Sequence, residues 1–442
     1  MKPVYIVSWL FALAISFVSC DDWLDKTPKD RLYPDVYFKT EDELRLFTNQ
    51  FYNNLVPSAV DIYSESSDLI VKSDLMLEMS GQRIIPDEGN GWNFTALRDI
   101  NFYLQYSHNC TEVNARNRYD GVARFFRAYF YFEKVKRYGD IPWYDKALDS
   151  DDPELYKARD SREFVMQKML EDLDFAISNL PKTKNAYVLT RWTALALKSR
   201  VCLFEGTFRK YHGLEDCEKY LNACVSASET FMNESGYTLY KSGSTPYRDL
   251  FASINLQADE VIFGRDYEAS LSVLHNVQNY ENSTTMGRPG MNKKIVNSYL
   301  MADGSRFTDK AGYETMTFDQ ECQNRDPRLA QTIRTPGYTR IGSTKKEAPN
   351  LAYTMTGYHL IKYSMTANYD EYNKSCNDIP LFRTAEVYLN FAEAKAELGT
   401  LKQADINKSI KLLRDRVGMT NLDMELANSK PDPYLMSAAT GY

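Results

Sequence analysis

The sequence predicts a mostly helical protein that carries an irregular, loop-rich insert. In several stretches apolar residues recur at steps of three or four, which is the spacing of an amphipathic α-helix. Between residues 240 and 378, by contrast, glycine, proline and polar turn residues become frequent and helix-length periodicity becomes scarce. The composition, 43% hydrophobic and 26% charged, is typical of a globular chain and excludes a disordered or fibrous one.

The N-terminus is typical of a secretory signal peptide. Lys2 precedes an apolar run over residues 4–18, which is shorter than the roughly 20 residues of a membrane-spanning helix. The run ends at Ser19-Cys20 and resembles a bacterial lipobox, with Phe17 in place of the usual leucine. This resemblance implies that residues 1–19 are removed and that Cys20 carries lipid. Asp21-Asp22 resembles the surface-export signal of Bacteroidetes lipoproteins, which places the protein on the outer face of the outer membrane. A retained anchor helix and an ordinary secreted protein are the alternatives.

Four amphipathic helices are expected before the insert, over residues 122–139, 161–180 and 193–206 and in a fourth segment that ends near Gly236. Gly139 with Pro142, and Pro181, are the stop signals of the first two. The residues expected on the buried faces include Phe125, Phe126, Phe132 and Val135 in the first helix, Phe164, Met169, Leu173 and Ile177 in the second, Leu197, Val201 and Phe204 in the third, and Leu221, Ala223 and Val225 in the fourth.

Helical order is expected to return at Pro380 and to end at Gly399, followed by a partner helix over residues 406–418. The segments 191–194 and 383–385 resemble each other, and each opens a helix rich in Ala and Leu. Small residues allow paired helices to pack closely, as tetratricopeptide repeats require, although a plain helical bundle is an alternative. The expected organisation is a signal peptide (1–19), an N-terminal helical region (20–239), the irregular insert (240–378) and C-terminal tetratricopeptide-like helices (379–442).

The search for chemistry gives mostly negative results. The net charge of −7 leaves no positive excess for nucleic acid. The four histidines are scattered, and no HExxH, GxSxG, Walker A or GxGxxG pattern occurs, so a zincin is not expected and no metal site or cofactor is assigned. The six cysteines after Cys20 show no zinc-binding spacing, and their pairing is left open. A glycosidase needs only two acidic residues, so it is kept as an alternative.

Several motifs occur in the order expected for one family. The stretch 124–132 and the turn 136–142 look like the signature helix and turn of the SusD/RagB family of outer-membrane nutrient-binding lipoproteins. The other stretches that agree are 20–28, 92–101, 299–304, 324–329, 380–399 and 414–419. Family members usually continue past this last stretch into further helices, whereas this chain ends at Tyr442, so the C-terminal helices are expected to be truncated.

The resemblance implies a tetratricopeptide-like scaffold and a shallow glycan site built largely by the insert. Such proteins lie as a lid on a TonB-dependent SusC-like transporter and capture oligosaccharides without any reaction. A sugar ring needs an exposed aromatic face beside polar groups. The residues expected to bind ligand are Trp92, Asn93, Tyr280, Asn282, Arg83 and Tyr267, while Trp143 is expected to be a packing residue. A helical-repeat adaptor for proteins and a surface glycosidase are the alternatives, and the ligand could also be a peptide or glycoprotein.

Overall fold

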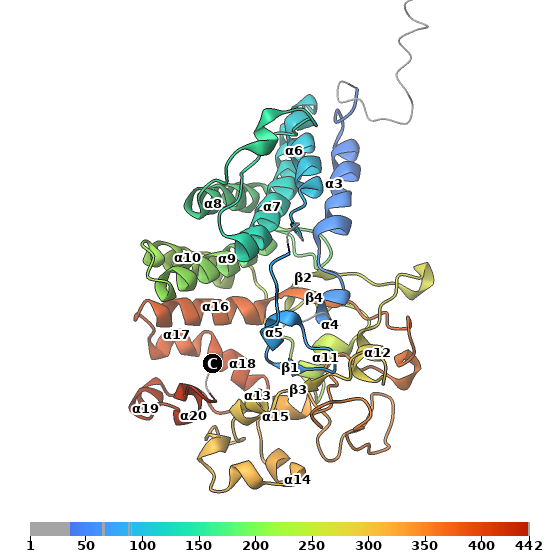
Figure 1. Cartoon of the computed structure of the whole chain (residues 1–442), viewed down its shortest axis with the longest axis vertical. Coiled ribbons are helices and arrows are strands. Elements are labelled where there is room, and N and C mark those ends of the chain that lie inside the picture. Colours follow the sequence, from blue (N-terminus) through green and yellow to red (C-terminus); the bar gives the residue numbers. More distant parts are fainter. Residues whose placement is uncertain (1–35, 64–66, 87–88, 90, 441–442) are drawn as a thin grey trace, which may run out of the picture.

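The computed structural model describes residues 36–63, 67–86, 89 and 91–440. The expected signal peptide and Cys20 lie outside the described residues. Helices dominate and confirm the expected fold class, with the long N-terminal helices in the upper half of Figure 1 and most of the insert in the lower half. The N-terminal helices are α3 (Glu41–Leu55), α4 (Val60–Tyr63), α5 (Leu77–Ser80), α6 (Thr95–Tyr106), α7 (Val113–Tyr138), α8 (Arg162–Asn179), α9 (Arg191–Tyr211) and α10 (Cys217–Glu234).

The insert holds only short elements. Its helices are α11 (Pro246–Ala252), α12 (Val277–Glu281), α13 (Lys293–Ser298), α14 (Phe318–Cys322) and α15 (Pro327–Ala330). The C-terminal helices are α16 (Thr384–Glu397), α17 (Gln403–Asn407), α18 (Ile410–Asp415), α19 (Met424–Ser429) and α20 (Pro433–Met436). The 3-10 helices are η1 (Ser107–Asn109), η2 (Pro153–Tyr156), η3 (Ala269–Leu271), η4 (Phe307–Asp309), η5 (Tyr313–Thr315) and η6 (Ala367–Tyr369).

Helix α7 is the centre of the N-terminal core. Its Phe125, Phe126 and Val135 are almost fully buried in the hydrophobic cluster of this region, and the Phe126 ring contacts Phe51 and Tyr52 of α3. The helix ends where the sequence predicts, because Gly139 takes the left-handed φ of +71° that a residue with a side chain rarely adopts.

Two expectations about these helices are wrong. Phe164 is 40% exposed, because the buried face of α8 is set by Val165, Met169 and Leu173 and Phe164 lies one residue off that stripe. Gly206 does not end its helix, since α9 continues to Tyr211. A Cβ atom on Gly206 would lie 2.7 Å from the side chain of Leu221 in α10. Glycine at this position therefore lets two helices approach closely, and tertiary packing outweighs its weak helix propensity.

The C-terminal expectations also need correction. Pro380 lies in strand β4 (Ile379–Arg383), and the helix begins only at Thr384. The expected partner helix is split into α17 and α18 at Ser409, whose hydroxyl donates to the carbonyl of Asp405 at 2.6 Å and competes with the regular helical bonds. The two similar sequence segments do open neighbouring helices, because α9, α10 and α16 all pack on one another (Figure 1).

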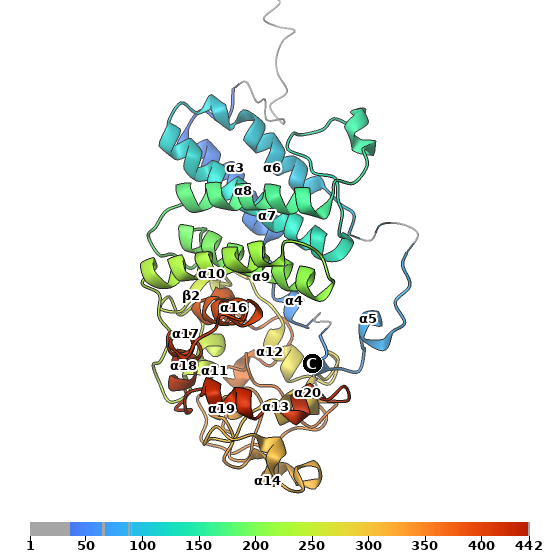
Figure 2. The same ribbon diagram turned by 90° about the vertical axis from the view of Figure 1, so that its left-hand side faces the viewer.

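Two small antiparallel sheets join the insert to the rest of the chain. Strand β1 (Ile70–Val71) pairs with β3 (Gly290–Met291), and β2 (Val261–Arg265) pairs with β4. The insert has its own core around Ile333 and Leu329. Figure 2 shows the insert beneath the helical layers, with α12 close to α4. In the part of the chain that the structure describes, no helix combines the length and apolar character that crossing a bilayer requires.

Candidate functional site

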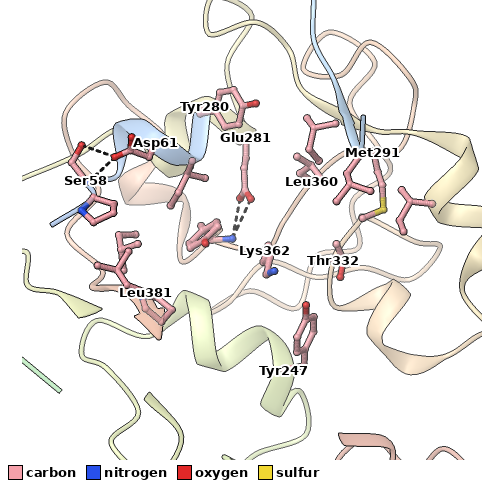
Figure 3. A pocket seen from close by; sticks show the side chains of 18 of the residues that line it. Ser58, Asp61, Tyr247, Tyr280, Glu281, Met291, Thr332, Leu360, Lys362 and Leu381 are labelled. Atoms are coloured by element: carbon pink, nitrogen blue, oxygen red, sulfur yellow. Dashed lines mark hydrogen bonds between the residues drawn. The ribbon is translucent and has the colours of Figure 1, made fainter. Parts of the chain in front are cut away.

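A cavity of about 520 Å³ lies where the insert meets α4 and strand β4, and we call it the central cleft (Figure 3). Residues from distant parts of the sequence line it. They include Asp61 from α4, Tyr247 from α11, Tyr280 and Glu281 from α12, Tyr299 after α13, Thr332 after α15, Lys362 and Tyr363 from the loop before η6, and Leu381 from β4.

Aromatic rings supply much of the wall of the central cleft. Tyr247, Tyr299 and Tyr363 are half-buried and keep part of their surface accessible, whereas Tyr280 is only 4% exposed. Tyr280 therefore belongs to the cleft wall, but the accessible ring surface comes from three tyrosines that were not among the residues expected to bind ligand. Tyr299 lies within 299–304, one of the stretches that agree with the SusD/RagB family, and this agreement could have marked it as a site residue. Nothing in the sequence around Tyr247 or Tyr363 distinguishes these two residues.

One carboxylate of the central cleft is held by the insert itself. Glu281 is 2% exposed and accepts a hydrogen bond from the backbone N–H of Tyr363 at 3.1 Å (Figure 3). It also accepts a hydrogen bond from the hydroxyl of Ser364 at 2.7 Å. Burial raises the pKa of the Glu281 carboxyl to about 7, although these donors act in the opposite direction. Asp61, the other acidic residue of the cleft wall, accepts the backbone N–H of Ser58 at 2.7 Å.

The opposite end of the cleft is positively charged. The ammonium group of Lys362 lies 4.2 Å from the ring centroid of Phe251 and 5.4 Å from that of Tyr247. Burial alone would raise the pKa of the Tyr247 phenol, but Lys362, Arg383 and Arg416 outweigh burial and hold that pKa below its usual value. Figure 3 shows the hydroxyl of Tyr247 directed toward Thr332 and Lys362.

A second cavity of about 290 Å³ lies beside Trp92 and is also lined by Phe94, Tyr144 and Arg98. The Trp92 ring makes edge contacts with Phe94 at 5.3 Å and with Tyr138 at 4.9 Å, and the Arg159 guanidinium lies 4.9 Å from the Trp92 ring. These contacts anchor the loop before α6 on α7 and leave Trp92 half-buried at the cavity.

The remaining expected site residues lie apart from one another. Asn93 is exposed, and its side-chain oxygen accepts the backbone N–H of Thr95 at 2.8 Å. Arg83 lies on the surface, 3.6 Å from Glu78. Tyr267 is buried, and its hydroxyl accepts the N–H of Ala59 at 2.8 Å.

Asn282 is occupied inside the insert. Its amide donates to the Ser364 hydroxyl at 2.9 Å, and its side-chain oxygen accepts from Arg334 at 2.8 Å. Trp143 is a packing residue as expected, 5% exposed and stacked on Tyr131 at 4.3 Å. Of the six expected ligand-binding residues, the structure thus places Tyr280 at the central cleft, Trp92 and Asn93 at or beside the smaller cavity, and the other three elsewhere.

The arrangement suits binding. Both acidic residues of the cleft wall are held by donors of the protein itself. Among the described residues, no three His, Cys, Asp or Glu side chains gather into a group that could hold a metal ion. The six described cysteines are unpaired, and Cys110 and Cys202 are buried.

Comparisons with known proteins agree with the sequence motifs. Two family models match, one described as the SusD family over residues 250–438 and one described as starch-binding associating with outer membrane over residues 82–191. SusD-like protein P2 of Formosa agariphila is 25% identical, and the match covers 94% of this chain and 82% of that protein.

Solved structures have the same fold. A SusD-like protein from Bacteroides fragilis matches with a TM-score of 0.70 and 22% identity, over 92% of this chain and 83% of the other. A SusD-like carbohydrate binding protein from the same species matches with a TM-score of 0.68 and 18% identity, over 87% of this chain and 80% of the other.

Proposed function

Because the chain belongs to the SusD/RagB family, we propose that it is a surface-exposed lipoprotein that binds a glycan and delivers it to a TonB-dependent SusC-like transporter of the outer membrane. The family is one of binding proteins, and this member is no enzyme. Two comparisons support the ligand class, since one matching family model is described as starch-binding and one matching structure is a carbohydrate binding protein.

We place the glycan in the central cleft. The observation that carries this proposal is the set of half-buried rings of Tyr247, Tyr299 and Tyr363 beside the polar groups of Lys362 and Thr332. Aromatic faces pack against the C–H faces of sugar rings, and polar side chains bond the hydroxyls. The volume of about 520 Å³ lies within the roughly 300–1,000 Å³ of ligand pockets.

Tyr299→Leu tests this site, because leucine retains apolar volume but lacks the flat ring. Loss of a stacking contact worth about 1–3 kcal/mol is expected to weaken glycan binding by roughly 5- to 150-fold. Isothermal titration calorimetry with a glycan selected from a polysaccharide panel measures the change, and a thermal midpoint near that of the wild type shows that the fold is retained.

Trp92→Leu is the matched control for the second candidate site. The smaller cavity beside Trp92 favours this alternative because Phe94 and Tyr144 also line it. If the central cleft binds the glycan, Trp92→Leu leaves the affinity within about threefold of wild type, or about 0.7 kcal/mol. Lost binding in Trp92→Leu together with unchanged binding in Tyr299→Leu would move the proposed site to the smaller cavity.

The anchor and the partner are tested together. A lid on a barrel buries a large surface, so an affinity-tagged wild-type protein is expected to co-purify with a TonB-dependent transporter from detergent-solubilised outer membrane.

Cys20→Ala is expected to lose fatty-acid labelling and to leave the membrane fraction, since Cys20 is the proposed acceptor. Equal labelling of both proteins would contradict the anchor, and recovery of the wild type alone would contradict the transporter.

A further inference from the structure

Lys362 is a cation at the wall of the central cleft, beside the phenol of Tyr247. No carboxylate among the described residues lies within ion-pair distance of its ammonium group. Lys362 instead lies over the rings of Phe251 and Tyr247, at 4.2 Å and 5.4 Å from the centroids. Its charge is therefore available to a ligand in the cleft.

The positive charge continues behind Tyr247. An adjoining cavity of about 510 Å³ shares Tyr247 and Tyr299 with the central cleft. Arginines at positions 328, 383, 414 and 416 line this cavity, whereas Asp326 is the acidic residue of its wall. Arg383 and Arg416 share the buried carboxylate of Glu260, and Arg328 pairs with Asp326.

Arg414 has a neutral partner. It donates to the carbonyl of Thr420 at 3.1 Å, and its pKa is lowered by burial and by the neighbouring Arg328. With Lys362, five cations thus surround two carboxylates, Glu260 and Asp326, in a chain whose net charge is −7. Such a local excess of positive charge attracts an anion.

The acidic residues of the central cleft do not neutralise the positive charge around Lys362 and Tyr247. Asp61 accepts hydrogen bonds from Ser58, and Glu281 accepts from Tyr363 and Ser364. Figure 3 shows Asp61 on the far side of the cleft from Tyr247, with Lys362 between Glu281 and Tyr247. The cleft therefore has an acidic side and a basic side.

We infer that the central cleft selects a glycan that carries a negative charge, a uronic acid carboxylate or a sulfate ester, and that this group lies against the Lys362 ammonium and the neighbouring Tyr247 hydroxyl. The inference rests on the proposed glycan-binding function and specifies its ligand class. The rings of Tyr247 and Tyr299 pack against the sugar, while the cations contribute to the choice between charged and neutral sugars.

Matched pairs of polysaccharide fragments test the inference on the full mature domain. The pairs are oligogalacturonate with its methyl ester, glucuronoxylan with its carboxyl-reduced form, and carrageenan with its desulfated form. In each pair that binds, the charged member is expected to bind about tenfold or more tightly, and its affinity is expected to fall as salt screens the interaction. The first two pairs test a carboxylate and the third tests a sulfate.

Lys362→Gln is expected to reduce the preference for the charged member to within about threefold, because glutamine can still donate to a sugar hydroxyl but carries no charge. Lys374→Gln, an exposed lysine of the same insert outside the cleft wall, is the control and is expected to keep the preference. If Lys362→Gln fails to fold, Tyr247→Phe removes the facing hydroxyl, keeps the ring and is expected to weaken the same preference.

The outcomes separate the inference from the function on which it rests. Equal binding of charged and neutral members would overturn the inference and leave glycan binding intact. A charged-sugar preference that persists in both Lys362→Gln and Tyr247→Phe would also overturn it. The absence of binding to every member of every pair would overturn the glycan-binding function and the inference together.

Discussion

Glu260→Gln is expected to lower the free energy of unfolding by about 3–5 kcal/mol, the usual cost of breaking a buried ion pair from one side. Glu260 is fully buried, and its carboxylate accepts from Arg383 at 3.0 Å and from Arg416 at 2.8 Å. Glutamine retains the shape but removes the charge, so two guanidinium groups lose their shared counter-charge. Urea denaturation followed by circular dichroism measures the loss.

A partly exposed pair is the control for this prediction. Glu386, which is 30% exposed, pairs with Arg200 at 2.5 Å. Glu386→Gln is expected to cost no more than about 1 kcal/mol, because water replaces a lost partner at such a site. A similar small cost for Glu260→Gln would contradict the prediction that Glu260 stabilises the fold as the shared counter-charge of Arg383 and Arg416.

The stability of the insert is expected to depend on pH through Glu281. Its pKa is raised from 4.5 to about 7 in the folded protein by burial, so folding favours the protonated form. This contribution to the free energy of unfolding is fully present below pH 4.5 and is lost as the pH rises through 7, a decrease of about 3 kcal/mol in all. Two buried histidines act in the opposite direction, because burial lowers the pKa of His275 to about 4 and that of His359 to about 3.

The difference between wild type and Glu281→Gln isolates the carboxyl group, since both proteins retain the histidines. The unfolding free energy of wild type minus that of the variant is expected to decrease by about 3 kcal/mol between pH 4.5 and pH 7.5. Urea titrations across this range give the difference. A constant difference would show that Glu281 titrates near its ordinary pKa.

Local signals predicted most of the long helices. The step of three or four between apolar residues, together with Gly139, predicted α7 from residue 122 to its end, although the helix begins earlier, at Val113. Ser161 caps α8 by accepting the N–H of Phe164 at 3.3 Å. Gly206 misled the prediction, because glycine within a helix and glycine after a helix look alike in a sequence. The contact with Leu221 of α10 distinguishes them, and it exists only after the helices pack.

The candidate site was less predictable. The aromatic and amide character of Trp92, Tyr280 and Asn282 suited a sugar, but residue type alone does not say whether a side chain already has a partner. Asn282 is hydrogen-bonded to Arg334 and Ser364, and the Tyr280 side chain is almost inaccessible to solvent. Burial depends on segments distant in the sequence, so such a site requires the folded chain.

By itself, the sequence determined the helical class, the irregular character of the insert and, through ordered motifs, the family, because each of these is written in short-range periodicity and residue order. The tertiary structure alone decided which side chains meet. Tyr247, Tyr299 and Lys362 line one cleft because the insert folds back on itself and is joined to the scaffold through the β1–β3 and β2–β4 pairings. The spacing of these residues in the sequence does not predict that they lie close together, because the loops between them are long and irregular. Their proximity results from the tertiary packing of the insert.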